Sequence, residues 1–171
     1  MTDRYIDSHN LEHLKLIKMK KNYTIFEEIN GHNKPIVFKL YGMKCPFGIE
    51  KYFFKEIVNF EFLNKENNNS MLNNYNKIKQ LDEFFRDRDE FNGKQYMSCL
   101  RPRDDYDPLV RIHVKQKKNI LTKVTNKNNQ IDTLFNVKNK LCTIDIEIIN
   151  LWVTDDNYGL TLGLNAVHYL T

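Results

Sequence analysis

The sequence predicts a mainly β protein with one central helix, closed into a small barrel. Three observations lead to this fold class: a long alternating segment near the C-terminal end, a series of shorter β-prone segments before it, and one segment of helical periodicity in the middle. A chain of 171 residues is long enough for one domain with a substantial core. We expect residues 1–20 to form a partly flexible N-terminal segment and residues 21–171 to form the single domain.

The alternating segment, Leu141–Tyr169, predicts a closing β-hairpin. Isoleucines in its first half and leucines in its second half alternate with mostly polar residues, which is typical of a strand with one buried and one solvent-facing side. Asp155–Asn157 supplies turn residues, and Gly159 permits a bulge or a close backbone approach. Trp152 and Tyr158 flank this turn.

The helical periodicity covers Met71–Arg86, where apolar residues recur at three- and four-residue spacing after Ser70, a suitable N-cap. The segment Leu11–Lys21 fits either a short amphipathic helix or a basic strand. The remaining β-prone segments are Asn22–Ile29, Ile36–Gly42, Ile49–Leu63, Gln95–Leu100, Leu109–Lys115, Ile120–Val124 and Ile131–Val137.

Together with the hairpin, these segments give roughly seven or eight strands with a helix inserted among them. Antiparallel strands in this number favour a closed sheet, because closure removes exposed strand edges. A five-stranded barrel of the oligonucleotide-binding (OB) kind, with extra strands, fits this outline. A β-sandwich fits it as well, and the pattern alone does not separate the two folds.

Composition excludes several classes of protein. The formal net charge of +4, from 26 basic and 22 acidic residues, is a mild basic bias that a solvated lysine-rich surface also explains. No apolar run is long enough to span a membrane, and the first residues lack the pattern of a secretory signal. Cys45, Cys99 and Cys142 lie far apart, which argues against a disulfide framework or a zinc site and favours a reducing intracellular compartment.

A row of basic side chains is expected on one strand. Arg111, His113 and Lys115 fall on the polar side of the strand at 109–115, and Arg101 and Arg103 precede it in a loop. Alternate positions of a strand are about 7 Å apart, close to the spacing of successive phosphates on an extended single strand. A solvated strand face explains the same row equally well.

Aromatic and basic residues interleave over Tyr41–Phe54. Bases stack on aromatic rings while lysines hold phosphates, and stacking contributes about 1–3 kcal/mol per base. The alternative to a binding surface is that most of these rings belong to the core, and we expect one of Phe53 and Phe54 there. Trp152 fits either a core position or a stacking platform. The residues predicted to bind single-stranded nucleic acid are those of the basic row, Arg101, Arg103, Arg111, His113 and Lys115, together with Tyr41, Lys44, Phe47, Lys51 and Tyr52, and with Trp152 and Tyr158 as further platforms.

Catalytic patterns are weak. The cluster Asp104, Asp105 and Asp107 has the residue types of a Mg²⁺ site, but an ion-paired surface loop explains it better because arginines surround it. The five histidines show no metal-ligand spacing. The sequence contains no phosphate-binding loop, nucleophile elbow or dinucleotide fingerprint. We therefore expect no enzymatic activity, no metal site and no cofactor.

The ending LCTIDIEIINLWVTDDNYGLTLGLNAVHYL resembles the last hairpin of single-stranded DNA-binding proteins of phages, and it is similar to their counterparts in large nucleo-cytoplasmic DNA viruses. The segment YGMKCPFGIEKY and the central helix occupy comparable places in those OB-fold proteins. The resemblance implies a protein that coats single-stranded DNA during replication and recombination, without strong sequence preference. The last residues, His168–Thr171, lack the acidic run found in the phage group.

Three functional hypotheses follow. The first is an OB-fold single-stranded DNA-binding protein, with replication proteins or a second copy of the chain as further partners and the host cytoplasm or nucleus as its compartment. The second is a protein-interaction or structural β-barrel that does not bind nucleic acid. The third and weakest is a metal-dependent nuclease that uses the Asp104–Asp107 loop.

Overall fold

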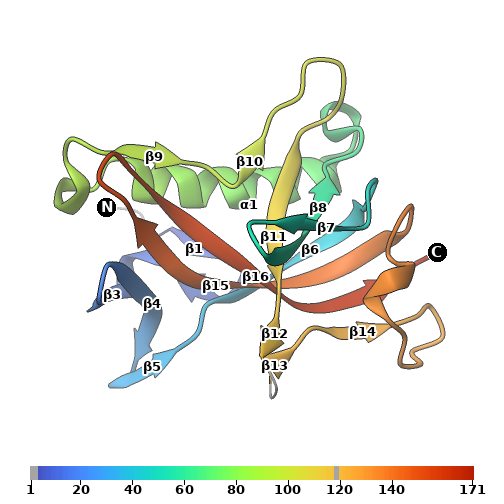
Figure 1. The fold of residues 1–171 in the computed structure, drawn as a ribbon, viewed down its shortest axis with the longest axis horizontal. Helices are drawn as coiled ribbons and strands as arrows, with labels where there is room; N and C mark the ends of the chain where they lie inside the picture. The colour runs from blue at the N-terminus through green and yellow to red at the C-terminus, as the bar shows by residue number, and fades with distance from the viewer. Residues whose placement is uncertain (1–3, 118–119) are drawn as a thin grey trace.

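The computed structural model describes residues 4–117 and 120–171 and places most strands in one strongly curled sheet (Figure 1). The central strands are long and apolar on one side. They are β6 (Val37–Lys44), β8 (Lys55–Glu61), β11 (Leu109–Val114), β15 (Leu141–Val153) and β16 (Asn157–Tyr169).

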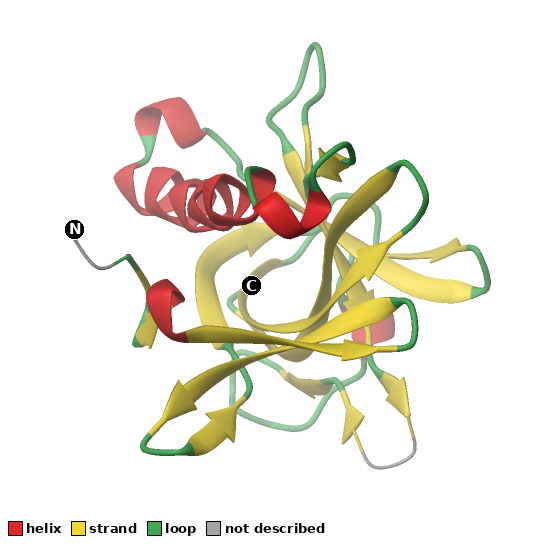
Figure 2. Ribbon diagram, turned by 90° about the vertical axis from the view of Figure 1, so that its left-hand side faces the viewer, coloured by secondary structure: helices red, strands yellow, loops and turns green. Residues whose placement is uncertain are grey.

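These strands close into a ring (Figure 2). β6 pairs antiparallel with β8 and β8 pairs antiparallel with β11. β11 then pairs parallel with β16, β16 pairs antiparallel with β15, and β15 returns antiparallel to β6. The ring confirms the mainly β, OB-like barrel with extra strands and decides against a sandwich.

Shorter strands extend or decorate this barrel. The segment Leu11–Lys21, for which the sequence left helix and strand open, forms a 3-10 turn at Leu11–His13. Strand β3 (Leu14–Met19) follows and pairs antiparallel with β4 (Asn22–Ile29). The additional strands are β1 (Tyr5–Ile6), β2 (His9–Asn10), β3 (Leu14–Met19), β4 (Asn22–Ile29), β5 (His32–Lys34), β7 (Ile49–Tyr52), β9 (Gln95–Met97), β10 (Leu100–Arg101), β12 (Gln116–Lys117), β13 (Ile120–Leu121) and β14 (Lys123–Thr125).

The predicted helix is α1 (Asn69–Arg86), inserted between β8 and β11. Its N-cap is Asn68, whose side chain accepts a hydrogen bond from the Met71 amide, so the prediction of Ser70 as the N-cap is wrong. Ser70 lies inside the first turn instead. The buried face of the helix, which includes Ile78 and Phe85, packs against the barrel core.

The expectation of one long strand over Ile49–Leu63 is wrong. The segment is a hairpin of β7 and β8, with Phe53 and Phe54 as its two-residue turn. Both turn residues have positive φ, 46° and 66°, where Asn and Gly are the usual signals. The left-handed conformation costs a non-glycine residue roughly 1–2 kcal/mol. The expected core position for one of these rings is wrong too, because they are 78% and 103% exposed.

The strand expected over Ile131–Val137 is also wrong. Ile131 makes only an isolated bridge with Thr125 and is 94% exposed, and Leu134–Asn136 is a 3-10 helix. The β-branched and aromatic composition that suggested a strand therefore lies in a loop.

The closing hairpin supplies much of the core. Ile144, Ile146 and Leu164 are fully buried, as their alternation predicted. Ile6 and Leu11 from the first twenty residues are buried in the same cluster. No helix in the part of the chain that the structure describes is long and apolar enough to cross a membrane.

Candidate nucleic-acid interface

One face of the barrel combines the features that ligand-binding OB folds use. In such barrels the surface of the second and third strands, with the loops joining strands one to two and four to five, binds oligonucleotides and oligosaccharides. Here those strands are β8 and β11, and the loops are residues 45–54 and 154–156. This face carries two adjoining hollows.

We call the two hollows the arginine hollow, of about 440 Å³, and the lysine hollow, of about 480 Å³. They share Lys55, His113 and Thr161, and together they form what we call the groove. The arginine hollow is lined by Asn22, Tyr52, Lys55, Met97, Ser98, Cys99, Arg101, Arg111, His113, Asn150, Trp152, Asn157, Leu160, Thr161 and Leu162.

The arginine hollow holds positive charge without a counterion. Lys55, Arg101 and Arg111 line it, and none of them forms an ion pair with a residue that the structure describes. No Asp or Glu is found among its described lining residues. Burial and the nearby Arg111 guanidinium lower the pKa of Arg101 from its usual value. Such a site favours an anionic ligand.

Two aromatic side chains flank this charge. The Arg111 guanidinium lies over the Tyr52 ring, with 4.1 Å between its central carbon and the ring centroid. Trp152 is partly exposed in the same hollow, which favours the stacking platform over the core position. Gly159 makes room for this indole, since a Cβ there would lie 2.7 Å from Trp152 Cζ2 and 2.7 Å from the Met97 carbonyl oxygen.

Several polar atoms in the hollow are buried without a hydrogen-bond partner. They are Arg111 Nε, His113 Nδ1 and Asn150 Oδ1. An unpaired buried polar atom costs about 1–3 kcal/mol. Burial, followed by the charges of Lys55 and Arg111, lowers the pKa of His113 from its usual value of 6.5.

Hydrogen bonds connect the wall of the arginine hollow to helix α1. Asp82 on α1 is buried and accepts hydrogen bonds from the Ser98 hydroxyl at 2.5 Å and the Tyr96 hydroxyl at 2.9 Å. Burial raises the pKa of this carboxyl, although the two donors act in the opposite direction. The segment that leads to Arg101 is therefore held in place by side-chain hydrogen bonds.

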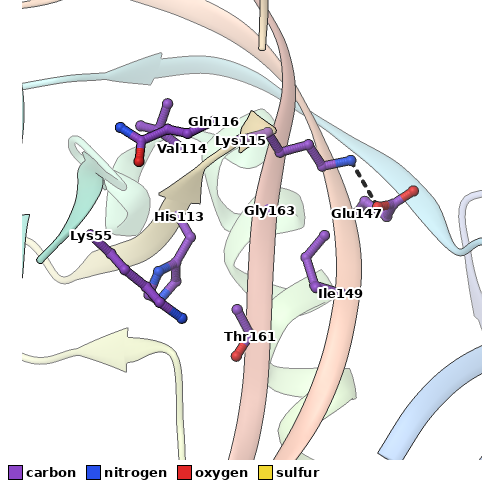
Figure 3. A pocket seen from close by; sticks show the side chains of 9 residues that line it. All are labelled: Lys55, His113, Val114, Lys115, Gln116, Glu147, Ile149, Thr161 and Gly163. Atoms are coloured by element: carbon purple, nitrogen blue, oxygen red, sulfur yellow. Dashed lines mark hydrogen bonds and ion pairs between the residues drawn. The ribbon is translucent and has the colours of Figure 1, made fainter. Parts of the chain in front are cut away.

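The lysine hollow differs because its outer lysine is neutralised. Lys115 Nζ donates to Glu147 Oε2 at 2.8 Å, and the pair lies at one end of the hollow, while Lys55 and His113 lie together on the other side (Figure 3). Glu147, on β15, is part of the lining and brings negative charge to this hollow, which disfavours DNA there.

The structure brings six of the predicted binding residues into the groove and leaves six outside it. Those in the groove are Tyr52, Arg101, Arg111, His113, Lys115 and Trp152. Phe47 and Lys51 line a separate hollow of about 350 Å³ with Phe135 and Lys138, because alternate residues of β7 face opposite sides of the hairpin.

Three further residues also lie away from the groove. Tyr41 is exposed beside the helix, where Lys77 Nζ is 5.5 Å from its ring centroid. Lys44 sits at the end of β6, paired in register with Glu61 of β8. Arg103 forms an ion pair with Glu61, and its Nε donates to the Asp107 carbonyl at 2.8 Å.

The prediction of Tyr158 as a stacking platform is wrong. Its ring is 1% exposed and stacks on Phe91, with 4.6 Å between the ring centroids. Its hydroxyl donates to the Phe85 carbonyl at 2.6 Å and also contacts the Arg86 carbonyl. Trp152 and Tyr158 flank the same turn, but they face opposite sides of the hairpin.

Sequence reasoning missed Lys55, which faces the groove beside His113. Its position was hidden because the hairpin turn before it was interpreted as continuous strand. Asp104, Asp105 and Asp107 are not arranged to hold a metal ion, and neither is any other group of three His, Cys, Asp or Glu side chains among the described residues.

Comparisons with known proteins bear on the fold. No protein-family model and no curated protein matches this sequence. The single-stranded DNA-binding protein from bacteriophage Enc34 matches in structure with a TM-score of 0.55 and 9% identity, over 92% of this chain and 90% of that chain. The same phage protein in complex with single-stranded DNA gives a TM-score of 0.52 at 7% identity, over 90% and 92%.

A second phage protein has the same fold. gp2.5, a single-stranded DNA-binding protein encoded by bacteriophage T7, gives a TM-score of 0.50 at 9% identity, over 79% of this chain and 86% of that chain. Identities this low show a shared fold alone. In its fold, then, the chain resembles single-stranded DNA-binding proteins of phages, which confirms the resemblance expected from the closing hairpin.

Proposed function

We propose that this protein binds single-stranded DNA along the groove. The observation that carries the proposal is the arginine hollow. Its described lining contains three cations, Lys55, Arg101 and Arg111, and two aromatic side chains, Tyr52 and Trp152, but no carboxylate. A single strand of DNA matches both features of this surface, because its phosphates pair with the cations and its flat bases stack on the aromatic rings. The resemblance in fold to phage single-stranded DNA-binding proteins supports the same assignment.

In this mechanism the cations hold the backbone and the rings hold the bases. Phosphates pair with the guanidinium and ammonium groups, releasing condensed counterions. A base stacks on Trp152, whose ring is partly exposed in the arginine hollow. Stacking is tolerant of base identity, so the strand is coated without strong sequence preference during replication and recombination. We assign the protein no catalytic role.

Fluorescence titration tests the proposal directly. Trp152 is the only tryptophan in the chain, so its emission reports the groove. Adding oligo-dT is expected to quench it, and three phosphate contacts predict that log K falls with log salt with a slope of about −2. Absence of binding at low salt would sink the proposal and favour the protein-interaction barrel instead.

A further inference from the structure

The turn of the β7–β8 hairpin has an unusual composition for its geometry. Tyr52 and Lys55 are paired in register, so Phe53 and Phe54 form a two-residue loop, and both have positive φ. This is the geometry of a type I′ turn, in which Asn-Gly is strongly preferred. Bulky residues with positive φ are genuine outliers.

Burial of the two rings does little to offset the strain of the turn. Phe53 is 78% exposed and Phe54 is 103% exposed, so Phe54 buries none of its surface. A strained turn that presents two exposed aromatic rings is explained neither by local conformational preference nor by core packing. Strain of this kind clusters at functional sites, and exposed apolar patches mark binding sites.

The position of the tip indicates what it contacts. Phe53 packs edge-on against Tyr52, with 4.6 Å between the ring centroids, and Tyr52 lies under Arg111 in the groove. Lys55, which directly follows the tip, lines both hollows of the groove. The tip therefore continues the aromatic wall of the groove at Tyr52, beside the cations Arg111 and Lys55.

We propose that Phe53 and Phe54 form a second base-stacking site, which takes unpaired bases of a DNA strand that extends beyond the groove. This inference rests on the proposed function of the groove. The charge of Arg111 and Lys55 selects an anionic occupant, and the flat faces of the rings suit nucleobases. Short strands fill the groove alone, and longer strands reach the tip as well.

The double variant Phe53→Asn/Phe54→Gly separates folding from binding. Because Asn-Gly suits the turn, the variant is expected to unfold at a temperature about 3 °C or more above the parent protein. Its Kd for an oligo-dT of about 15 nucleotides is expected to rise about tenfold, whereas its Kd for about 5 nucleotides stays within about twofold. Unchanged affinity for the longer strand in a stably folded variant would overturn the inference.

Two controls complete the experiment. Tyr106→Ala removes another exposed aromatic ring, 70% exposed, and is expected to leave both Kd values unchanged. Sedimentation of the DNA-free protein tests whether the tip instead contacts a second copy of the chain. Self-association of the parent protein that the double variant abolishes would overturn the inference. If the parent protein binds neither oligonucleotide, the proposed function fails; if it binds both and the variant matches it, only the stacking site fails.

Discussion

The arginine hollow and the ion-paired parts of the surface differ in how their basic residues are neutralised. Several lysines outside the arginine hollow sit next to carboxylates: Lys39 Nζ lies 2.7 Å from Asp145, Lys77 Nζ lies 2.6 Å from Asp7, and Lys15 Nζ lies 2.6 Å from Glu28. Inside the hollow, Lys55, Arg101 and Arg111 have no such partner among the described residues. The residue types are the same, and only the carboxylates differ.

This difference explains why the net charge of +4 said little about function. A cation paired with a carboxylate contributes little potential at the distance of a ligand, whereas a few unpaired cations gathered in a hollow produce a concentrated positive potential. The distribution of acidic residues, more than the number of basic ones, marks the candidate site.

The strongest way to break the comparison is to reverse charge on each side. Arg101→Glu/Arg111→Glu and Lys15→Glu/Lys39→Glu each lower the net charge by four, from +4 to 0. We expect the groove variant to bind oligo-dT at least about 100-fold more weakly at low salt, because two phosphate contacts become repulsive. The variant at the ion-paired lysines Lys15 and Lys39 should stay within about threefold. Equal losses would show that bulk charge alone determines binding.

Removing the indole tests the aromatic part of the groove. Trp152→Ala is expected to weaken binding about tenfold, within the roughly 1–3 kcal/mol attributed to one stacked base. Its salt slope should remain that of the parent protein, since no cation is lost. Fluorescence anisotropy of a labelled strand measures both quantities. Tyr158→Phe is the matched control, and a loss of affinity there would contradict the assignment of Tyr158 to the interior.

The lysine hollow can be converted toward the arginine hollow by a single change. Glu147→Gln removes the partner of Lys115 while keeping the side-chain shape. We expect a two- to fivefold gain in affinity at low salt and a salt slope steeper by about 0.7, because one more lysine becomes available to a phosphate. Titrations at three salt concentrations are sufficient. An unchanged slope would mean that the strand does not reach this hollow.

The smallest expected effect is on the pH dependence of the free energy of unfolding. His9 contacts Glu27 at 2.9 Å, whereas His113 has cations as neighbours and a pKa below 6.5 in the folded protein. The unfolded chain therefore takes up this proton first as pH falls through 6.5, and the free energy of unfolding decreases. His113→Gln should remove that part of the pH dependence. Thermal melts between about pH 5 and 7.5 measure it.

Alternation and periodicity predicted the barrel well because they report burial directly. The closing hairpin, the strand carrying Arg111 and the central helix all lie where the pattern placed them. The β7–β8 turn was missed because two phenylalanines replaced the usual turn residues, so local sequence and local backbone disagreed. Residue propensities do not predict a turn whose residues disfavour its backbone conformation.

The candidate site was predictable only in part. The strand period placed Arg111 and His113 on a polar face, and the groove indeed contains them. Whether a lysine or arginine has a carboxylate partner depends on contacts between distant segments, such as Arg103 with Glu61, which no local pattern records. For the same reason the sequence did not distinguish Trp152 from Tyr158.

The buried hydroxyl of Tyr158 has a consequence for local opening of the molecule. It donates to the Phe85 carbonyl, near the C-terminal end of α1, although Tyr158 lies 73 positions further along the chain, in β16. Helix ends normally fray because their last carbonyls lack partners. Here the end of the helix cannot open unless the start of β16 also moves. In hydrogen exchange, the amides of the last helical turn and of the closing hairpin should therefore be released together, as one cooperative unit.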